Sequence, residues 1–514
     1  MMKKVVVIGA GLGGLSAAIR LQKAGYQVTI LEQNGKTGGK ANEISEGGFR
    51  FDTGPSLLTM PFVIEQLFQE AGLDAKNYLE FIQPEVLCRY FYPSGKVIDA
   101  FSDLIKFIDE LSGKFDLKKE VVESYFDYSK KIYDLTAELF LFNSFREWST
   151  FFNKKAALTL LNLPKIDSFR TMHEANKSFF GDPEALQLFD RYATYNGSNP
   201  YLAPATLNII QHVEYGIGGY TLKGGIYSLS KALTEVALKS GVKIATNRQV
   251  DEIVLAKNDV QGVCCRGKVI DDPNRVVGVR CGEELFETDI VVSNSDVTNT
   301  YKKLLNDSQV RPAKKYYKRE PSSSALVFYW GVKGNFPELK MHNILFSDDY
   351  KKEFDEIFIS GKAPEDPTVY IYISSKVNED DAPEGFENWF VMINMPPATS
   401  NDYYSIDSIK KSIISKIKNM LHIDLNENIV FERVLTPEMI EEKTSSVYGS
   451  LYGISSNNKY AAFLRQDNRS REYAGLYFCG GSAHPGGGIP LVILSGKIVS
   501  ELVAKYETRE MVIG

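Results

Sequence analysis

The pattern of apolar positions predicts a strand, a helix and a second strand at the start of the chain. Residues 5–8 form the β-branched run VVVI, apolar residues then recur at helical spacing in LSAAIRLQKAGY, and QVTILE follows. A short apolar run, a periodic segment and another apolar run are typical of a βαβ unit.

Helical spacing dominates the region from about 60 to 225, where apolar residues lie three and four apart. The clearest segments are PFVIEQLFQEAGL, SDLIKFIDELSGKF and KEVVESYFDYSKKIYDLTAELFLF. Strand-like runs begin near residue 242, including VKIATNRQVDEIVLA, DIVVSNSDV, SSSALVFYWGV, TVYIYIS and WFVMINMP. The chain then reads as a strand in GLYFCGG and a helix in LVILSGKIVSELVAK. These patterns predict an α/β protein.

Glycines between the first strand and helix point to a nucleotide site. Gly9, Gly11 and Gly14 precede the helix, and Glu32 ends the second strand. In the dinucleotide fingerprint, such glycines let the backbone approach the pyrophosphate, which faces the helix N-terminus. The acidic residue binds a ribose hydroxyl.

A second glycine-rich pattern favours FAD over NAD. TGGKAN follows Glu32 closely, and GFRFDTGPS comes next, where an NAD domain would continue with another βα unit. This extended pattern resembles the FAD-binding amine oxidase and phytoene desaturase superfamily. The resemblance implies that the GG turn lies near the cofactor diphosphate and ribose.

Composition argues against nucleic acid as a partner and leaves the role of the many aromatic residues open. A hydrophobic fraction of 44%, a charged fraction of 24% and a formal charge of −6 show no basic bias, so nucleic acid is not an expected partner. The 28 Tyr and 30 Phe could pack cores or line a large apolar cavity. Five cysteines without CxxC spacing indicate a reduced, cytoplasmic setting, and five scattered histidines predict no metal site.

The whole chain resembles bacterial carotenoid desaturases of the phytoene desaturase type. The resemblance is carried by GAGLGGLSAAIRLQKAGYQVTILEQ, GGFRFDTGPS, YNGSNPYLAPATLNIIQHVEYGIGGYTLKGGIYSLSKAL, DIVVSNSDV, SSSALVFYWG and GLYFCGGSAHPGGGIP. Many flavoproteins carry an acidic residue after the glycines of the terminal strand, where this chain has Ser482.

The resemblance implies a Rossmann-like FAD-binding domain assembled from 1–75, 226–300 and 440–514. It also implies an α+β substrate domain (76–100 and 301–439) and a helical, membrane-facing portion (101–225). The last strand and helix would return beside the first. The cofactor-binding residues implied are Gly9, Gly11, Leu12, Gly13, Gly14, Glu32, Gln33, Gly39, Lys40, Gly54, Pro55, Ser56, Val250, Gly481, Gly488, Ile489 and Pro490.

The implied reaction is FAD-dependent desaturation of a carotenoid, with a hydride leaving for flavin N5 and a proton lost from the adjacent carbon. Oxygen or a membrane quinone would reoxidise the flavin.

Asp167 and Arg170, three apart on one helix face, are candidates for acid–base roles or form a surface ion pair. Glu214 faces the flavin or braces its helix. His484 is a base or a turn histidine held by its backbone neighbours. Cys479 is a buried strand residue or, alternatively, a covalent flavin link.

The terminal motif SAHPGGGIPLVILSG is more similar to that of 3,4-desaturases acting on hydroxylated or methoxylated carotenoids than to that of phytoene enzymes. Gly487, Leu491 and Val492 would alter the pocket beside the flavin. We therefore expect a 1-hydroxycarotenoid 3,4-desaturase. The alternatives are a multistep phytoene desaturase, a non-redox carotenoid cis–trans isomerase and a prenyl-binding escort-like protein.

The sequence has no run of 18 or more apolar residues, so it predicts no membrane span. Residues 139–163 mix Phe, Leu and Trp148 with Arg146, Lys154 and Lys155, a composition suited to a membrane interface or to a buried helix pair. A carotenoid dissolves only in lipid. We therefore expect a cytoplasmic protein that is peripherally associated with the inner face of the cell membrane.

Overall fold

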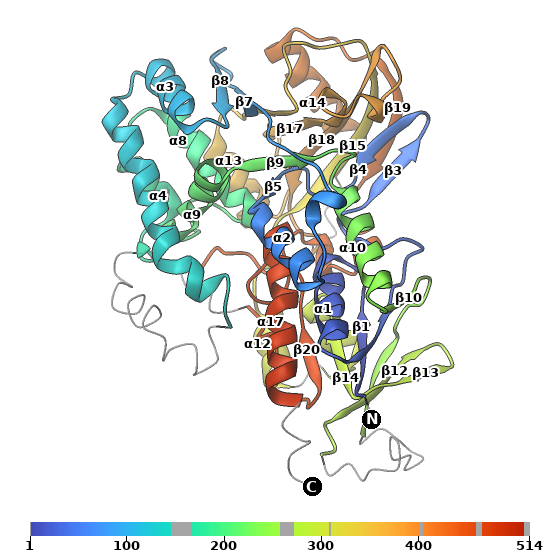
Figure 1. Cartoon of the computed structure of the whole chain (residues 1–514). Coiled ribbons are helices and arrows are strands. Elements are labelled where there is room, and N and C mark those ends of the chain that lie inside the picture. Colours follow the sequence, from blue (N-terminus) through green and yellow to red (C-terminus); the bar gives the residue numbers. More distant parts are fainter. Residues whose placement is uncertain are drawn as a thin grey trace.

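The computed structural model describes residues 2–144, 166–256, 272–307, 310–399, 404–458 and 465–507. Two sheets organise these residues, and helices cover both (Figure 1). The N-terminal sheet lies in the lower half of the view, the larger sheet in the upper half, and α3, α4 and α8 form the left side. Of the predicted interfacial segment 139–163, residues 145–163, which include Trp148, lie outside the described residues.

The first sheet is the predicted nucleotide-binding sheet. It has the order β10-β2-β1-β14-β20, and every neighbouring pair is parallel. Its strands are β1 (Lys4–Ile8), β2 (Gln27–Leu31), β10 (Lys243–Ala245), β14 (Ile290–Ser293) and β20 (Leu476–Phe478). Strands from three distant parts of the chain therefore share one sheet. The last helix lies against the first, as predicted, but the strand in GLYFCGG pairs with β14, which separates it from β1.

Helices cover one face of this sheet and a small sheet covers the other. The helices are α1 (Leu12–Lys23), α2 (Pro61–Glu70), α10 (Tyr227–Lys239) and α17 (Ile489–Glu507). The small antiparallel sheet consists of β11 (Glu252–Leu255), β12 (Val276–Cys281) and β13 (Glu284–Glu287). Burial of both faces explains why the central strands are almost entirely apolar.

Helices α1 and α17 lie side by side and in unusually close contact (Figure 1). A Cβ atom on Gly496 would lie 2.6 Å from Ser16 Oγ and 2.7 Å from the backbone nitrogen of Ala17. Ser16 Oγ also donates a hydrogen bond to the carbonyl oxygen of Ile493, at 2.7 Å. The two helices can approach this closely because residue 496 has no side chain.

The second sheet has seven strands in the order β19-β15-β18-β17-β16-β7-β8 and is antiparallel except between β16 and β7. Its strands are β7 (Val86–Phe91), β8 (Val97–Phe101), β15 (Ser324–Lys333), β16 (His342–Leu345), β17 (Val369–Ile373), β18 (Phe386–Met395) and β19 (Ile429–Leu435). Helix α14 (Ile406–Leu421) packs on one face through Ile409, Ile413 and Ile417.

Shorter elements connect these parts. The strands are β3 (Glu43–Glu46), β4 (Phe49–Asp52), β5 (Leu58–Thr59), β6 (Phe81–Ile82) and β9 (Gly219–Leu222). The remaining α-helices are α3 (Leu104–Phe115), α4 (Lys119–Phe140), α7 (Met172–Lys177), α8 (Pro183–Asp190), α9 (Ile209–Gln211), α11 (Val297–Asn299), α12 (Arg311–Tyr317), α13 (Tyr350–Asp355) and α15 (Pro437–Thr444).

The prediction that Asp167 and Arg170 share a helix face is wrong. Both lie in an irregular stretch before α7, and Asp167 has a left-handed backbone with φ of +53°. Thr171 begins α7 with a capping box, in which its side chain accepts from the Glu174 amide while the Glu174 carboxylate accepts from the Thr171 amide. The helix therefore starts after Arg170. Within the described residues, no helix is long and apolar enough to cross a membrane.

The contact at Gly496 leads to a first prediction. Gly496→Ala should push α17 from α1, lower the thermal unfolding temperature and reduce bound flavin, because overpacking costs about 1–3 kcal/mol. Gly113→Ala, on the exposed side of α3 where a Cβ meets nothing within 4 Å, should stabilise by about 0.5–1 kcal/mol. Thermal melting and the flavin-to-protein absorbance ratio test both, and equal behaviour of the two variants would refute the packing argument.

Candidate functional site

A cavity of about 1470 Å³ lies between the two sheets. The turns after β1, β2 and β14 line one part, and residues of β15–β18 line another. Carboxyl ends of parallel strands are the usual ligand edge of such a sheet. The volume exceeds the roughly 300–1,000 Å³ of a typical ligand pocket, so it can accommodate a cofactor together with a second ligand.

The first glycine turn forms a backbone cradle at this edge. Gly9 has φ of +91°, and a Cβ on Gly14 would lie 2.2 Å from the Gly9 carbonyl oxygen. A Cβ on Gly11 or Gly13 would lie 2.8 Å from the side-chain amide of Asn294. Side chains at Gly11, Gly13 or Gly14 would clash with the turn's own backbone or with Asn294. Gly9, Gly11 and Gly13 line the cavity, whereas Gly14 is not among the described lining residues.

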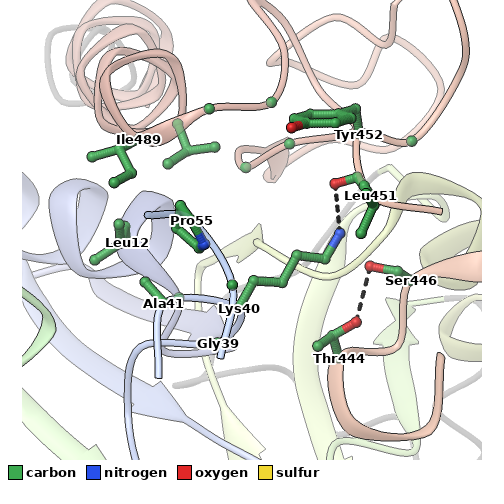
Figure 2. A pocket seen from close by; sticks show the side chains of 18 of the residues that line it. Leu12, Gly39, Lys40, Ala41, Pro55, Thr444, Ser446, Leu451, Tyr452 and Ile489 are labelled. Atoms are coloured by element: carbon green, nitrogen blue, oxygen red, sulfur yellow. Dashed lines mark hydrogen bonds between the residues drawn. The ribbon is translucent and has the colours of Figure 1, made fainter. Parts of the chain in front are cut away.

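Two helix N-termini converge on the cavity. The first turn of α1 is Leu12–Leu15 and that of α17 is Ile489–Val492, all of them uncharged residues. Figure 2 shows Leu12 and Ile489 close together on one side of the pocket. Amides at a helix N-terminus lack intrahelical partners and attract anions, so the paired ends suit a diphosphate.

Glu32 fixes the turn between the first two strands. The carboxylate is 4% exposed and accepts hydrogen bonds from the backbone amides of Ala10 (2.7 Å) and Asn34 (2.9 Å). Glu32, Gln33 and Val250 all line the cavity, as the predicted ribose and adenine contacts require.

The second glycine turn packs directly on the first. The Gly38 amide donates to the Ala10 carbonyl at 2.8 Å, and a Cβ on Gly39 would lie 3.3 Å from Gly11 Cα. Gly54 passes so close to the Lys40 carbonyl oxygen that a Cβ would lie 2.3 Å from it. These contacts bring Gly39, Lys40, Gly54, Pro55 and Ser56 to the cavity wall.

Lys40 carries a buried amine at this wall. Its Nζ donates to the carbonyl oxygens of Ser450 (3.0 Å) and Leu451 (2.8 Å), as Figure 2 shows for Leu451. Burial lowers the pKa of Lys40 to about 8, and the charge of Asp296 opposes the shift. Burial also raises the pKa of Asp296, because its carboxylate loses solvent.

The C-terminal glycine loop lines the cavity through Gly481, Gly488, Ile489 and Pro490. The Ser482 hydroxyl accepts from the Val297 amide at 3.0 Å and so holds the loop after β14. Cys479 is buried, and it is not among the described residues that line the cavity.

His484 reaches the cavity wall from the same loop and is 4% exposed. Its ring Nε2 lies 3.0 Å from the Asn143 carbonyl, and its own carbonyl accepts from Asn468 and Ser495. Hydrogen bonds therefore hold both the ring and the backbone carbonyl of this histidine.

Glu214 lies on the cavity wall in the π-helix η5 (His212–Ile217) and is 1% exposed. It accepts hydrogen bonds from the hydroxyls of Tyr192 (3.0 Å) and Tyr195, and pairs with Arg191 at 3.5 Å. Several donors therefore hold the Glu214 carboxylate in place.

Asp167 and Arg170 form an ion pair, with Arg170 Nε 3.0 Å from Asp167 Oδ1. The Tyr128 hydroxyl donates to the same carboxylate at 2.7 Å, and the Arg170 side chain is 43% exposed. Their neighbours Ile166 and Ser168 line the cavity, but neither member of the pair is among the described lining residues. The structure does not bring this pair together with Glu214 or His484.

Several cavity residues were not predicted from the sequence. Asn294 and Asp296 follow β14, and a polar residue directly after a buried parallel strand was a usable signal. Arg191, Tyr195, His342 and Tyr370 also line the cavity. Their sequence neighbourhoods resemble ordinary core segments, so only the fold reveals them.

The parallel sheet, the glycine cradle and the two helix N-termini are those of a flavin-dependent oxidoreductase, and the cavity continues from them along the large sheet. The chain belongs to the flavin containing amine oxidoreductase family, whose model matches residues 12–504. Its cofactor is FAD, and the glycine cradle and paired N-termini fit the diphosphate of that group. The predicted superfamily resemblance is confirmed.

Two curated relatives extend along almost the full chain. The 1-hydroxycarotenoid 3,4-desaturase of Flavobacterium sp. (strain P99-3) is 44% identical over 98% of this chain and 99% of its own length. The 4,4'-diapolycopene oxygenase of Methylomonas sp is 34% identical over 98% of each chain.

Solved structures share the fold at low identity. An oxidoreductase from Methanosarcina mazei has a TM-score of 0.60 at 16% identity, covering 97% of this chain and 100% of that one. Putrescine oxidase, in its complex with putrescine, has a TM-score of 0.62 at 14% identity, covering 98% and 99%.

The buried Lys40 amine leads to a prediction for cofactor affinity. Binding of the anionic diphosphate should keep Lys40 protonated, so FAD affinity for the apoprotein should be constant below about pH 8 and fall above it, by up to about tenfold per pH unit. Lys40→Met should bind FAD more weakly at neutral pH and show no such decline. Fluorescence titration of the apoprotein measures both, and a pH-independent wild type would contradict the prediction.

Proposed function

We propose that this chain is an FAD-dependent carotenoid desaturase that introduces the 3,4 double bond into 1-hydroxycarotenoids. The observation that carries the proposal is the likeness to the Flavobacterium desaturase along nearly the whole of both chains. The likeness to the Methylomonas oxygenase is weaker.

The cavity wall supports a long apolar substrate. Helices α4 and α9, η5 and the start of α17 contribute apolar side chains to it: Phe140, Leu141, Ile209, Ile210, Val213, Leu491 and Val492. A hydrocarbon polyene offers few polar handles, so binding must come mainly from apolar contact and exclusion of water. Leu491 and Val492, predicted to shape the pocket, lie in this wall.

Bound FAD would supply an acceptor for the hydride, which carries the two electrons that desaturation removes; the remaining hydrogen leaves the adjacent carbon as a proton. The chain's own residues position the polyene against that acceptor and keep water out. Gly487 contributes to the shape of this part of the pocket, because a Cβ there would lie 2.7 Å from Tyr452 Cδ1. Oxygen or a membrane quinone is the proposed final electron acceptor.

The reaction predicts a defined change of mass. The purified FAD-loaded protein, incubated under air with a 1-hydroxylated acyclic carotenoid, should yield a product lighter by two hydrogen atoms. Phytoene, presented separately, should react more slowly. Mass spectrometry of the extracted carotenoids provides the measurement. An unchanged mass with altered double-bond geometry would support isomerisation instead, and efficient conversion of phytoene alone would support the multistep phytoene enzyme.

Docking to the inner face of the cell membrane, from the cytoplasm, is the second part of the proposal. Its support is the lipid-soluble substrate class and an exposed apolar residue near the α4 end of the cavity. Phe62 is 38% exposed, and its ring lies 6.3 Å from that of Phe142, next to cavity-lining Leu141.

This docking proposal predicts that Phe62→Ser weakens sedimentation with anionic liposomes, because an aromatic ring is lost from the membrane-facing surface. Leu285→Ser is the matched control, since Leu285 is 45% exposed on β13 in the cofactor-binding half. Equal liposome binding by wild type and both variants would refute docking at Phe62, and absence of binding by all three would refute membrane association.

A further inference from the structure

Three hydrogen-bonded side chains join the predicted flavin-binding turn to the large sheet. Ser56 Oγ lies 2.6 Å from Tyr370 Oη, which lies 2.6 Å from His342 Nδ1. Ser56 follows Gly54 and Pro55, Tyr370 is on β17 and His342 is on β16. All three residues line the cavity. We refer to them as the Ser56–Tyr370–His342 chain.

Apolar side chains make up much of the wall around this chain, and the buried Arg191–Glu214 pair is a charged group that acts on it. Leu57 comes directly after Ser56, and Ile344 lies two residues after His342 on β16. Met392 of β18 is the strand partner of Tyr370. All three line the cavity, as does Phe390. Polar groups on an apolar wall are costly unless they are hydrogen-bonded, so such a group marks a position where a ligand has a polar atom.

His342 is neutral in this position. Burial, together with the nearby charge of Arg191, lowers the pKa of His342 to about 3. A neutral imidazole carries one N–H, so Nδ1 either donates to Tyr370 Oη or accepts the Tyr370 proton. Among the described residues, Nε2 of the same ring has no hydrogen-bond partner.

Either tautomer leaves Ser56 able to bind an alcohol. If His342 Nδ1–H donates to Tyr370, the tyrosine donates to Ser56 and the serine proton is free to be donated. If Tyr370 donates to His342, Ser56 donates to Tyr370 and its lone pairs are free to accept. An alcohol can both donate and accept, so it matches both arrangements.

The position of the chain suits a hydroxyl group close to the reacting bond. In a 1-hydroxycarotenoid the oxygen is on C1, two bonds from C3, so the group that holds it must lie beside the flavin. Ser56 meets this condition because its turn packs on the second glycine turn, through the contact of Gly54 with the Lys40 carbonyl.

We infer that the Ser56–Tyr370–His342 chain binds the 1-hydroxyl group of the substrate and thereby selects hydroxylated carotenoids. Ser56 and Tyr370 contact the hydroxyl, and His342 is a positioning residue that orders their protons. The inference rests on the proposed function, because it requires a substrate with a hydroxyl group near the reacting carbons.

Tyr370→Phe tests the inference by removing one oxygen atom. The readout is kcat/KM for an acyclic carotene that carries a 1-hydroxyl group, divided by kcat/KM for the same carotene without it. Wild type should prefer the hydroxylated compound, and the variant should lose about 10- to 100-fold of that preference, because a site built around a hydrogen bond discriminates strongly. The loss should fall on the hydroxylated compound alone.

Tyr372→Phe is the matched control. Tyr372 lies two residues further along β17, is buried, and donates a hydrogen bond to Asp52 at 3.4 Å, but it is not among the described residues that line the cavity. Its ring stacks on that of His342, and the substitution removes the hydroxyl while keeping this ring. The control should retain the wild-type preference. Ser56→Ala is a second test that does not depend on the folding of Tyr370→Phe, and it should also reduce the preference when both rates are expressed per bound flavin.

The outcomes separate the inference from the proposed function. A wild-type preference that persists in both Tyr370→Phe and Ser56→Ala overturns the inference and leaves the proposed function standing. A wild type that does not prefer the hydroxylated carotene overturns both. Loss of flavin from Ser56→Ala, with equal loss of activity on the two carotenes, shows that Ser56 serves the cofactor and also overturns the inference.

Discussion

The contact between α1 and α17 is the constraint on which the rest of the site depends. Two helix N-termini can face one diphosphate only if the helices lie together, and they do so because Gly496 leaves room for the backbone at Ala17. The same contact places β20 beside β14 and brings the C-terminal glycine loop to the cavity. A small displacement of α17 would therefore change both the cofactor cradle and the adjoining wall.

The cofactor half could be predicted from the sequence because close backbone approach leaves local signals. Gly9 has a φ of +91°, and a Cβ on Gly11 or Gly14 would meet Asn294 or the Gly9 carbonyl, so each position favours glycine. The apolar runs of the central strands show burial on both faces. The Asp167–Arg170 helix was predicted wrongly because residue spacing alone was used. The capping signal of Thr171 and Glu174 places the helix start after that pair.

The substrate half could not be predicted in the same way. The hydrogen bond between Ser56 and Tyr370 joins residues 314 positions apart, and it depends on how β17 is aligned with β16 and β18. A one-residue change of register would turn Tyr370 to the opposite face. Arg191 and Glu214 are likewise brought together only by the packing of helices in the 101–225 region. Such positions have no distinctive local pattern.

The position of β20 at one edge of the nucleotide-binding sheet has a consequence during synthesis. Domains tend to fold as the chain leaves the ribosome, yet β14 must wait for a partner that is translated after all seven strands of the large sheet. Until then the nascent protein exposes an unpaired strand edge, which is a template for aggregation. The nucleotide-binding sheet is therefore exposed to misassembly from the translation of β14 until that of β20.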